Sequence, residues 1–309
     1  MSIRYLLLSL LLLLSPLIRA ESKPAALDPA KLQLASVHAL VMDLDTSEVL
    51  YERNPDAVVP IASLTKMMTA MVVLDDEKNA PLEEWIAVEV SQNNEMKNVF
   101  SHVRIGSQLQ RRDMLLLALM ASENRAAATL AHHYSGGYLA FINAMNRKAE
   151  ALGMSNTRFV EPTGLSPDNV STSRDLARLI QASARYSLIA ELSTTPKKDV
   201  YFRAPRHVRA FYNTNPLVRN DHWSIDMSKT GYIEEAGRCL VLQAKIQKRH
   251  LAIVLLDSFG KRSHIGDAGR VRRWLETGKS GSVHPSASAY VQRRQKILLA
   301  SEEASPELH

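Results

Sequence analysis

Cysteine is almost absent from this chain of 309 residues, which contains one, Cys239. A single thiol excludes an internal disulfide and any zinc site built from several cysteines. Beyond residue 20, no apolar run approaches the ~20 residues that a membrane span needs. The chain has no internal repeat, and 38 Lys and Arg against 32 Asp and Glu leave a formal charge of only +6. We therefore expect no nucleic-acid partner, although the small excess suits a protein that acts on an anionic polymer.

An export signal is predicted at the start of the chain. Arg4 precedes a leucine-rich run at 5–14, which Pro16 interrupts before the small residue Ala20. This order is typical of a secretory signal peptide, to which we assign residues 1–20. No cysteine follows the run, which disfavours a lipoprotein anchor, and an uncleaved anchor is the alternative. We expect a periplasmic protein without a stable membrane anchor after cleavage.

The rest of the chain divides into three parts by composition. Apolar residues make up 46% and charged residues 23%, which is typical of a folded globular protein. Residues 21–35 contain scattered Pro, Ala and Lys and are predicted to form a linker, and residues 36–278 are predicted to form one domain. After Gly278 the composition changes to Ser, Ala, Arg and Glu, so we expect a flexible tail at 279–309.

Strand patterns lie at the two ends of that domain, and helix patterns lie between them. The β-rich runs are at 37–44, 49–51, 222–227, 239–246 and 251–256. Helical periodicity is found at 63–72, 113–131, 141–152, 172–186 and 265–275, and the Met residues of the first run are predicted to be core. These patterns predict an α/β (α+β) protein in which an early hairpin completes a late sheet. The sheet would be five-stranded and antiparallel, flanked by helices, with an inserted all-helical subdomain.

The first candidate catalytic motif is the Ser-Leu-Thr-Lys at 63–66, which opens the first predicted helix. Residues three apart share a helix face, so the Ser63 hydroxyl and the Lys66 amine should lie side by side. The alternative is that Ser63 caps the helix. The same Ser-x-x-Lys pattern recurs at 258–261, but that copy ends a strand and contains a glycine, so it lacks the helix that would align the pair.

Two further motifs follow in the chain. Ser-Glu-Asn at 122–124 comes directly after a buried helical run, and Lys-Thr-Gly at 229–231 ends the strand pattern that begins at residue 222. Taken alone, the first could be a turn, and Lys229 could be a solvated lysine on an edge strand. The combination of all three motifs in this order is much more specific than any one of them.

With these motifs the sequence resembles the low-molecular-mass penicillin-binding proteins, and more closely their D-alanyl-D-alanine endopeptidase branch. The likeness covers about residues 35–275 and includes the motif surroundings at 61–69, 122–128, 157–165, 229–233 and 235–239. It implies a β-lactamase/transpeptidase-like fold. It also implies a serine peptidase that works through an acyl-enzyme and needs no cofactor.

The resemblance gives each motif residue a role. Ser63 would be the nucleophile, Lys66 its base, and Ser122 the relay that passes a proton to the leaving amine. Burial and the nearby ammonium of Lys229 would keep Lys66 largely neutral. The backbone N–H groups of Ser63 and Tyr232 would form an oxyanion hole. The expected substrate-binding residues are Asn124, Lys229, Thr230, Gly231 and Tyr232, with Thr230 on a carboxylate.

Arg238 is a further candidate for substrate binding. It begins the strand after Lys-Thr-Gly, and a two-stranded return of this length can bring it beside Thr230. Its planar fork suits a carboxylate of the stem peptide. The alternative is an ion pair with Glu234 or Glu235 in the turn. No metal site is expected at His132 and His133, because adjacent helical residues point in different directions.

Several functions remain open for this set of motifs. The endopeptidase reaction would cleave the D-alanyl-meso-diaminopimelate cross-links of peptidoglycan, and β-lactams would trap the enzyme covalently. A D-alanyl-D-alanine carboxypeptidase is one alternative. The resemblance implies an extra β-rich domain and a membrane-binding helix for that group, and we expect neither in the residues after the last predicted helix. A class A-like β-lactamase is another, for which Glu161 would have to hold a water, yet Leu165 stands where that pattern has Asn. A non-catalytic peptidoglycan-binding module is the third.

Overall fold

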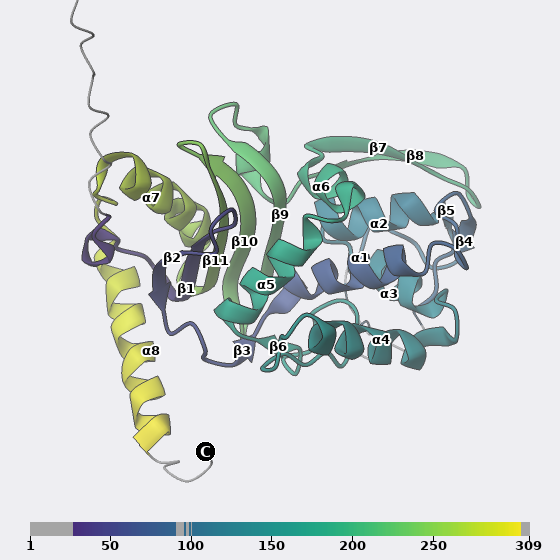
Figure 1. Cartoon of the computed structure of the whole chain (residues 1–309). Coiled ribbons are helices and arrows are strands. Elements are labelled where there is room, and N and C mark those ends of the chain that lie inside the picture. Colours follow the sequence, from purple (N-terminus) through teal and green to yellow (C-terminus); the bar gives the residue numbers. More distant parts are fainter. Residues whose placement is uncertain (1–26, 91–95, 97–98, 100, 304–309) are drawn as a thin grey trace, which may run out of the picture.

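A five-stranded antiparallel sheet lies at the centre of the protein, with helices on both of its faces (Figure 1). The computed structural model describes residues 27–90, 96, 99 and 101–303. The strand order is β2-β1-β11-β10-β9. The strands are β1 Ser36–Asp43, β2 Val49–Arg53, β9 Ser224–Ile233, β10 Gly237–Ile246 and β11 Arg249–Ser258. The early hairpin joins the late strands through the β1–β11 pair, which confirms the predicted sheet.

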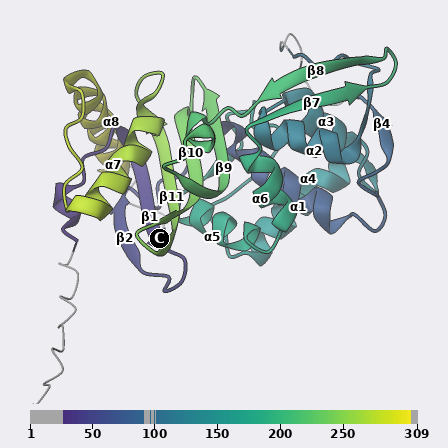
Figure 2. The same cartoon turned by 90° about the horizontal axis from the view of Figure 1, so that it is seen from above.

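The central strands are apolar on both faces because each face is covered. Side chains alternate between the faces of a strand, and in β10 Leu240 and Leu242 pack towards Trp274 of α7 (Ser263–Thr277). Cys239 and Val241 of the same strand pack on the opposite side, in the core of the helical block. Figure 2 shows the same arrangement from above, with α7 on one side of the sheet and the helical block on the other.

The helical block is inserted between the hairpin and the late strands, as the sequence predicts. Its helices are α1 Thr65–Asp75, α2 Arg111–Met120, α3 Asn124–His132, α4 Gly137–Ala151 and α5 Ser173–Ser183. Two small sheets, β3 Val59–Pro60 with β6 Val170–Ser171 and β4 Trp85–Ala87 with β5 Gln108–Gln110, join its loops. Met67, Met68 and Met71 of α1 are buried in its core, which confirms their predicted packing role.

The single helix predicted over 113–131 is two helices. The break between α2 and α3 falls at Ser122, whose φ of +58° is in the left-handed region. A non-glycine residue rarely adopts this conformation, so the turn is stabilised by its surroundings and not by local propensity. Apolar periodicity continues across the break, which is why the pattern alone does not reveal it.

One region has no counterpart in the sequence prediction. Helix α6 (Ser187–Thr194) leads into a hairpin of β7 (Lys197–Phe202) and β8 (His207–Tyr212), which lies above α2 and α3 in Figure 2. Most of its side chains are exposed, and Val200, Phe202 and Phe211 are the residues that anchor it in the core. The sequence of β7 opens with three charged residues, and β8 mixes His and Arg with apolar residues, so neither strand shows a sustained apolar alternation.

At the two ends of the domain, the described residues form neither the predicted linker nor the predicted flexible tail. Leu32 and Leu34 are buried against the sheet, so the chain before β1 is part of the core. In place of a flexible tail, Pro285–Glu303 forms helix α8. The predicted signal peptide lies outside the described residues. Within the described part, no helix is long and apolar enough to cross a membrane.

Candidate active site

Ser63 and Lys66 lie side by side at the start of α1. Ser63 is in a short 3-10 turn, η2 (Ala62–Leu64), that runs directly into α1, and Lys66 is in the first turn of that helix. The Lys66 Nζ lies 2.8 Å from the Ser63 Oγ. The residue at the N-cap of α1 is Leu64, and no side chain caps either the turn or the helix there. Ser63 is therefore paired with a buried amine and is not a helix cap.

Two glycines allow other segments to approach the backbone of Ser63 closely. A Cβ on Gly164, whose φ is +81°, would lie 1.9 Å from the Ala62 carbonyl oxygen. A Cβ on Gly231 would lie 3.2 Å from the Ser63 nitrogen. The glycine of the Lys-Thr-Gly motif thus lets β9 pass against the turn that carries Ser63, and Gly164 closes the opposite side.

Lys66 is fully buried and makes three short hydrogen bonds. Besides Ser63, its Nζ donates to the Asn124 Oδ1 at 2.7 Å and to the Thr163 carbonyl at 2.5 Å. Burial lowers the pKa of Lys66 to about 7, against the opposing effect of the Glu161 and Glu123 carboxylates. A substantial fraction of the amine is therefore neutral at neutral pH.

The three partners of Lys66 determine what its neutral form can do. An amine that has lost a proton keeps two N–H donors and gains one lone pair. The Asn124 Oδ1 and the Thr163 carbonyl oxygen are acceptors, so they hold the two remaining donors. The lone pair then faces the Ser63 hydroxyl, which can donate. This is the arrangement that a general base needs.

A second buried lysine lies on the other side of the site. Lys229 of β9 is 1% exposed, which excludes a solvated edge-strand lysine. Its Nζ donates to the Ser122 Oγ and to the Thr230 carbonyl, both at 2.9 Å. Burial first, and then the neighbouring Lys66, hold the pKa of Lys229 well below its ordinary value. The Ser122 hydroxyl is thus bonded to Lys229.

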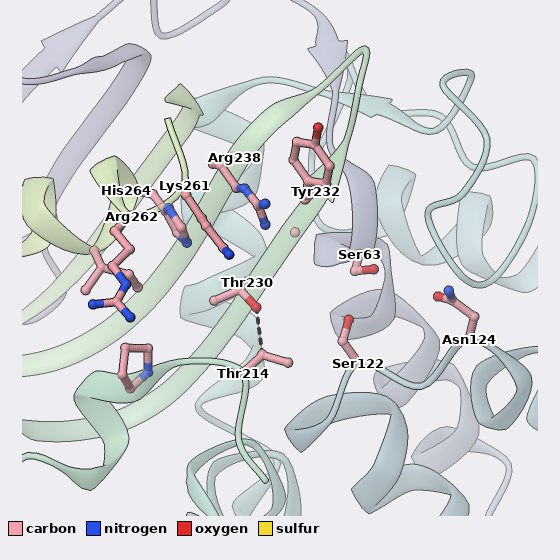
Figure 3. A pocket seen from close by; sticks show the side chains of 13 residues that line it. Ser63, Ser122, Asn124, Thr214, Thr230, Tyr232, Arg238, Lys261, Arg262 and His264 are labelled. Atoms are coloured by element: carbon pink, nitrogen blue, oxygen red, sulfur yellow. Dashed lines mark hydrogen bonds between the residues drawn. The ribbon is translucent and has the colours of Figure 1, made fainter. Parts of the chain in front are cut away.

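These residues open into a pocket of about 480 Å³. Figure 3 shows Ser63, Ser122 and Asn124 on one side of it and a group of basic side chains on the other. The described residues that line it include Arg238, Lys261 and Arg262 but no Asp or Glu. The Thr230 hydroxyl, on the strand between the two sides, is hydrogen-bonded to the Thr214 hydroxyl at 2.6 Å. The pocket therefore favours an anionic ligand.

Arg238 points into this pocket. It lies opposite Tyr232 in the β9–β10 pair, and its guanidinium carbon is 3.9 Å from the centre of the Tyr232 ring. In the described part of the chain it forms no ion pair with Glu234 or Glu235. Stacking on an aromatic ring orients the guanidinium and leaves the donors at its edge available.

Sequence reasoning missed four polar residues of the pocket, Thr214, Lys261, Arg262 and His264, and two apolar ones, Pro216 and Ile265. Thr214 follows the undetected hairpin. Lys261 belongs to the second Ser-x-x-Lys pattern, whose spacing suggests a nucleophile and gives no sign of a binding role. Burial, then Arg238, lowers the pKa of His264 to about 4, so this ring is neutral near pH 7. No motif or spacing in the sequence links any of these residues to the catalytic motifs.

Glu161 holds its own loop together. Its carboxylate accepts hydrogen bonds from the backbone N–H groups of Thr163 at 2.7 Å, Gly164 at 2.5 Å and Leu165 at 3.0 Å, and from the Asn169 amide at 2.8 Å. This loop supplies both Gly164 and the Thr163 carbonyl to the site. The contacts agree with the structural role expected of Glu161. Among the residues described, no group of three or more His, Cys, Asp or Glu side chains could hold a metal ion.

Comparison with known proteins identifies the class. Residues 23–260 match the family described as D-alanyl-D-alanine carboxypeptidase. The D-alanyl-D-alanine endopeptidase of Pseudomonas aeruginosa is 55% identical over 90% of this chain and 89% of its own length. That of Escherichia coli is 51% identical over 92% of this chain and 91% of its own.

Solved structures of similar proteins support the same class. The Streptomyces K15 DD-transpeptidase superimposes with a TM-score of 0.72 at 26% identity, covering 80% of this chain and 97% of that one. Penicillin-Binding Protein D2 of Listeria monocytogenes, in a cefotaxime-bound form, gives 0.69 at 28%, covering 80% and 98%. The fold is thus that of the penicillin-binding proteins and DD-transpeptidases, as the resemblance implied. The chain belongs to the D-alanyl-D-alanine carboxypeptidase family, and it is a serine peptidase.

Proposed function

We propose that this protein is a periplasmic D,D-endopeptidase that cleaves the D-alanyl-meso-diaminopimelate cross-links of peptidoglycan. The observation that carries the chemistry is the buried Lys66 amine, which is 2.8 Å from Ser63 and has its other two hydrogen bonds committed to acceptors. The relatives named endopeptidase support the choice of reaction, since they match at 55% and 51% along nearly their whole length.

Acylation begins when Ser63 transfers its proton to the neutral Lys66 and its oxygen attacks the D-alanyl carbonyl. The negative charge that develops on the carbonyl oxygen is stabilised by the backbone N–H groups of Ser63 and Tyr232. Gly231 makes this pair feasible, because it lets β9 lie close to the Ser63 nitrogen. The carbon–nitrogen bond then breaks, and the carbonyl stays on Ser63 as an ester.

The leaving amine takes its proton from Ser122. Lys229 donates a hydrogen bond to the Ser122 oxygen, which leaves the hydroxyl hydrogen free to point towards the substrate. The proton that Ser122 loses is restored by its hydrogen-bonded partner Lys229, and the proton that Lys66 gained in the first step passes to solvent, which replaces the one that Lys229 gave. Water then attacks the ester, Lys66 accepts one proton of that water, and Lys66 returns this proton to the Ser63 oxygen as the ester bond breaks. A β-lactam would form the same ester and would block the site.

Substrate binding uses the cationic side of the pocket. Thr230 and Arg238 hold the carboxylate next to the scissile bond, and the Asn124 amide binds the peptide backbone. Lys229 and the absence of acidic lining residues in the described structure favour the negatively charged stem peptide.

The carboxypeptidase alternative is less well supported. The carboxypeptidase DacA of Escherichia coli is 30% identical, and the match spans 62% of its length. A β-lactamase is disfavoured because the Glu161 carboxylate is committed to loop backbone groups, so it does not hold a deacylating water.

The experiment that tests the proposal is incubation with purified cross-linked muropeptides and identification of the products by mass. An endopeptidase gives two uncrosslinked stems, whereas a carboxypeptidase removes only a terminal D-alanine. Rapid turnover of penicillin in place of a stable adduct would indicate a β-lactamase, and a protein that fluorescent penicillin does not label would be a binding module. Recovery of the mature protein in the periplasm without detergent tests the location; retention in salt-washed membranes would contradict it.

A further inference from the structure

A second hollow adjoins the catalytic pocket. Its volume is about 320 Å³. Three of its lining residues, Tyr232, Arg238 and Lys261, also line the catalytic pocket, so the two hollows share a wall. Phe259 and Tyr290 line this hollow and do not line the catalytic pocket. Together the two hollows make one groove that begins at Ser63 and ends against α8.

The chemistry of this hollow is aromatic and positively charged. The rings of Phe259 and Tyr290 stack with centroids 5.1 Å apart and an angle of 30° between their planes. Arg238 and Lys261 form no ion pair within the described residues, and Glu234 is the one acidic residue on the walls. Unpaired cations beside an aromatic surface suit a peptide that carries carboxylates.

Helix α8 holds the walls of this hollow through Asp257. The Tyr290 hydroxyl donates to the Asp257 Oδ1 at 2.6 Å, and the Arg294 Nε donates to the Oδ2 at 2.8 Å. Asp257 is buried, and its φ of +50° is a strained value for a non-glycine residue, so these contacts hold a bend at the end of β11. The bend leads directly into the loop that carries Phe259 and Lys261.

The same carboxylate supports Arg238 from behind. A Cβ on Gly237, the first residue of β10, would lie 2.6 Å from the Asp257 Oδ1. The start of β10 therefore rests against Asp257, and Arg238 is the next residue along. A chain of contacts thus runs from Arg294 through Asp257 to the guanidinium that both hollows share. The segment 279–309, which the composition suggests is a flexible tail, contributes the helix that builds this wall.

We propose that the second hollow binds the second stem peptide of the cross-linked substrate and that α8 is the element that positions it. This proposal rests on the proposed endopeptidase function. A cross-linked substrate carries a stem on each side of the scissile bond, and a pocket of about 480 Å³ is of the size that holds a single small ligand. The other stem must extend beyond that pocket. The adjoining hollow offers cations for its carboxylates and aromatic rings for its apolar atoms.

The test compares two substrates and three variants. The substrates are a purified cross-linked muropeptide dimer and the same dimer with its second stem trimmed to the cross-linking residue. Phe259→Ala removes part of the wall of the second hollow directly, and Arg294→Ala releases α8 from Asp257. Arg293→Ala is the matched control, because this arginine is the exposed neighbour on the same helix.

We expect Phe259→Ala and Arg294→Ala to raise KM for the full dimer about fivefold, the size of effect that one aromatic or charged contact gives. The values of kcat and of the penicillin acylation rate should stay within about twofold of wild type. Arg293→Ala should behave as wild type, and the trimmed dimer should show the same KM with every variant. Arg294→Lys, which keeps the charge next to Asp257, should recover much of the lost affinity.

An unchanged KM for the full dimer in Phe259→Ala, or an equal rise with the trimmed dimer, would overturn the subsite. A parallel loss of kcat, acylation and melting temperature in Arg294→Ala would overturn the positioning role of α8. Binding of both dimers to the Ser63→Ala protein by calorimetry separates this inference from the proposed function. If the wild type reacts with penicillin but cleaves neither dimer, the endopeptidase function fails, and calorimetry still decides the subsite.

Discussion

The chain contains the pattern Ser-x-x-Lys twice, and the two copies differ in structure. In the first, η2 and α1 place the Lys66 amine 2.8 Å from the Ser63 oxygen, and the lysine is fully buried. In the second, Ser258 ends β11 and its hydroxyl is hydrogen-bonded to Ser36 at 2.6 Å, whereas Lys261 is exposed. The same spacing gives an adjacent pair on a helix but not at the end of a strand, where side chains alternate between faces.

The two lysines also differ in their surroundings. Burial lowers the pKa of Lys66 to about 7, so it can accept a proton at neutral pH. Lys261 is exposed to solvent and lines the pocket. In the mechanism that we propose, the first copy supplies the base and the second supplies only positive charge. The comparison teaches that burial, and not spacing, separates a catalytic lysine from a binding one.

The largest effect is expected at the nucleophile. Ser63→Ala should abolish both penicillin labelling and muropeptide cleavage, because no other described hydroxyl accepts a hydrogen bond from Lys66. Gel fluorescence with labelled penicillin measures the first and product masses measure the second. Ser258→Ala is the matched control and should label normally. If penicillin still labels the Ser63 variant, Ser63 is not the nucleophile, and Ser258 becomes the candidate.

The next effect is expected at the base. Lys66→Ala should slow acylation by about 10³-fold, within the range that a positioned general base contributes. Lys66→Arg should be equally slow, because a guanidinium does not lose its proton near neutral pH. In the wild type the acylation rate should rise as pH increases through about 7, since only the neutral form of Lys66 can accept a proton. A stopped-flow profile that is flat from pH 6 to 8 would contradict this.

A smaller effect is expected at Gly164, which packs against the turn that carries Ser63. Gly164→Ala would place a Cβ 1.9 Å from the Ala62 carbonyl, so the turn that carries Ser63 must shift. A displacement of about 1 Å should reduce the acylation rate by about 100-fold. Gly260→Ala, in the second copy, is the control: its Cβ would be 3.3 Å from the Ser263 hydroxyl, so only backbone strain of about 1 kcal/mol is expected. Equal acylation rates in the two variants would refute the tight packing around Ser63.

Arg238 should affect peptide binding more than acylation. Arg238→Ala should weaken cleavage of the cross-linked dimer by about 2 kcal/mol, the cost of losing one partner of a desolvated charge pair. The measurement is kcat/KM with the purified dimer. An arginine with only a turn-stabilising role would change the melting temperature instead and cost under about 1 kcal/mol. Wild-type rate and affinity in this variant would remove Arg238 from the site.

The smallest effect is expected at Lys261. Because this side chain is exposed, Lys261→Ala should raise KM for the dimer only about threefold at low salt. Since mobile ions screen exposed charges, the difference should disappear near 1 M salt. The effect of Arg238→Ala should persist there. If Lys261→Ala lowered kcat as much as Lys66→Ala, Lys261 would have a part in catalysis and not only in binding.

Much of the fold followed from local pattern. The strands at both ends of the domain and the helices between them were predictable, because buried runs and helical periodicity are local properties. The two helices around Ser122 were not, since the left-handed turn depends on what surrounds it. The hairpin of β7 and β8 and the helix α8 were missed because their sequences have no sustained apolar pattern. A few contacts with the rest of the protein hold them in place.

The sequence by itself determined which groups could perform the chemistry: a serine and a lysine three apart at a helix start, a Ser-Glu-Asn turn and a Lys-Thr-Gly strand. It also determined the class, through the order of these motifs. Only the tertiary structure decided which lysine is buried, which partner Ser122 has, and which distant cations line the pocket. The reason is physical: spacing places side chains on one face of an element, whereas burial, pKa and charge depend on neighbours brought together from elsewhere in the chain.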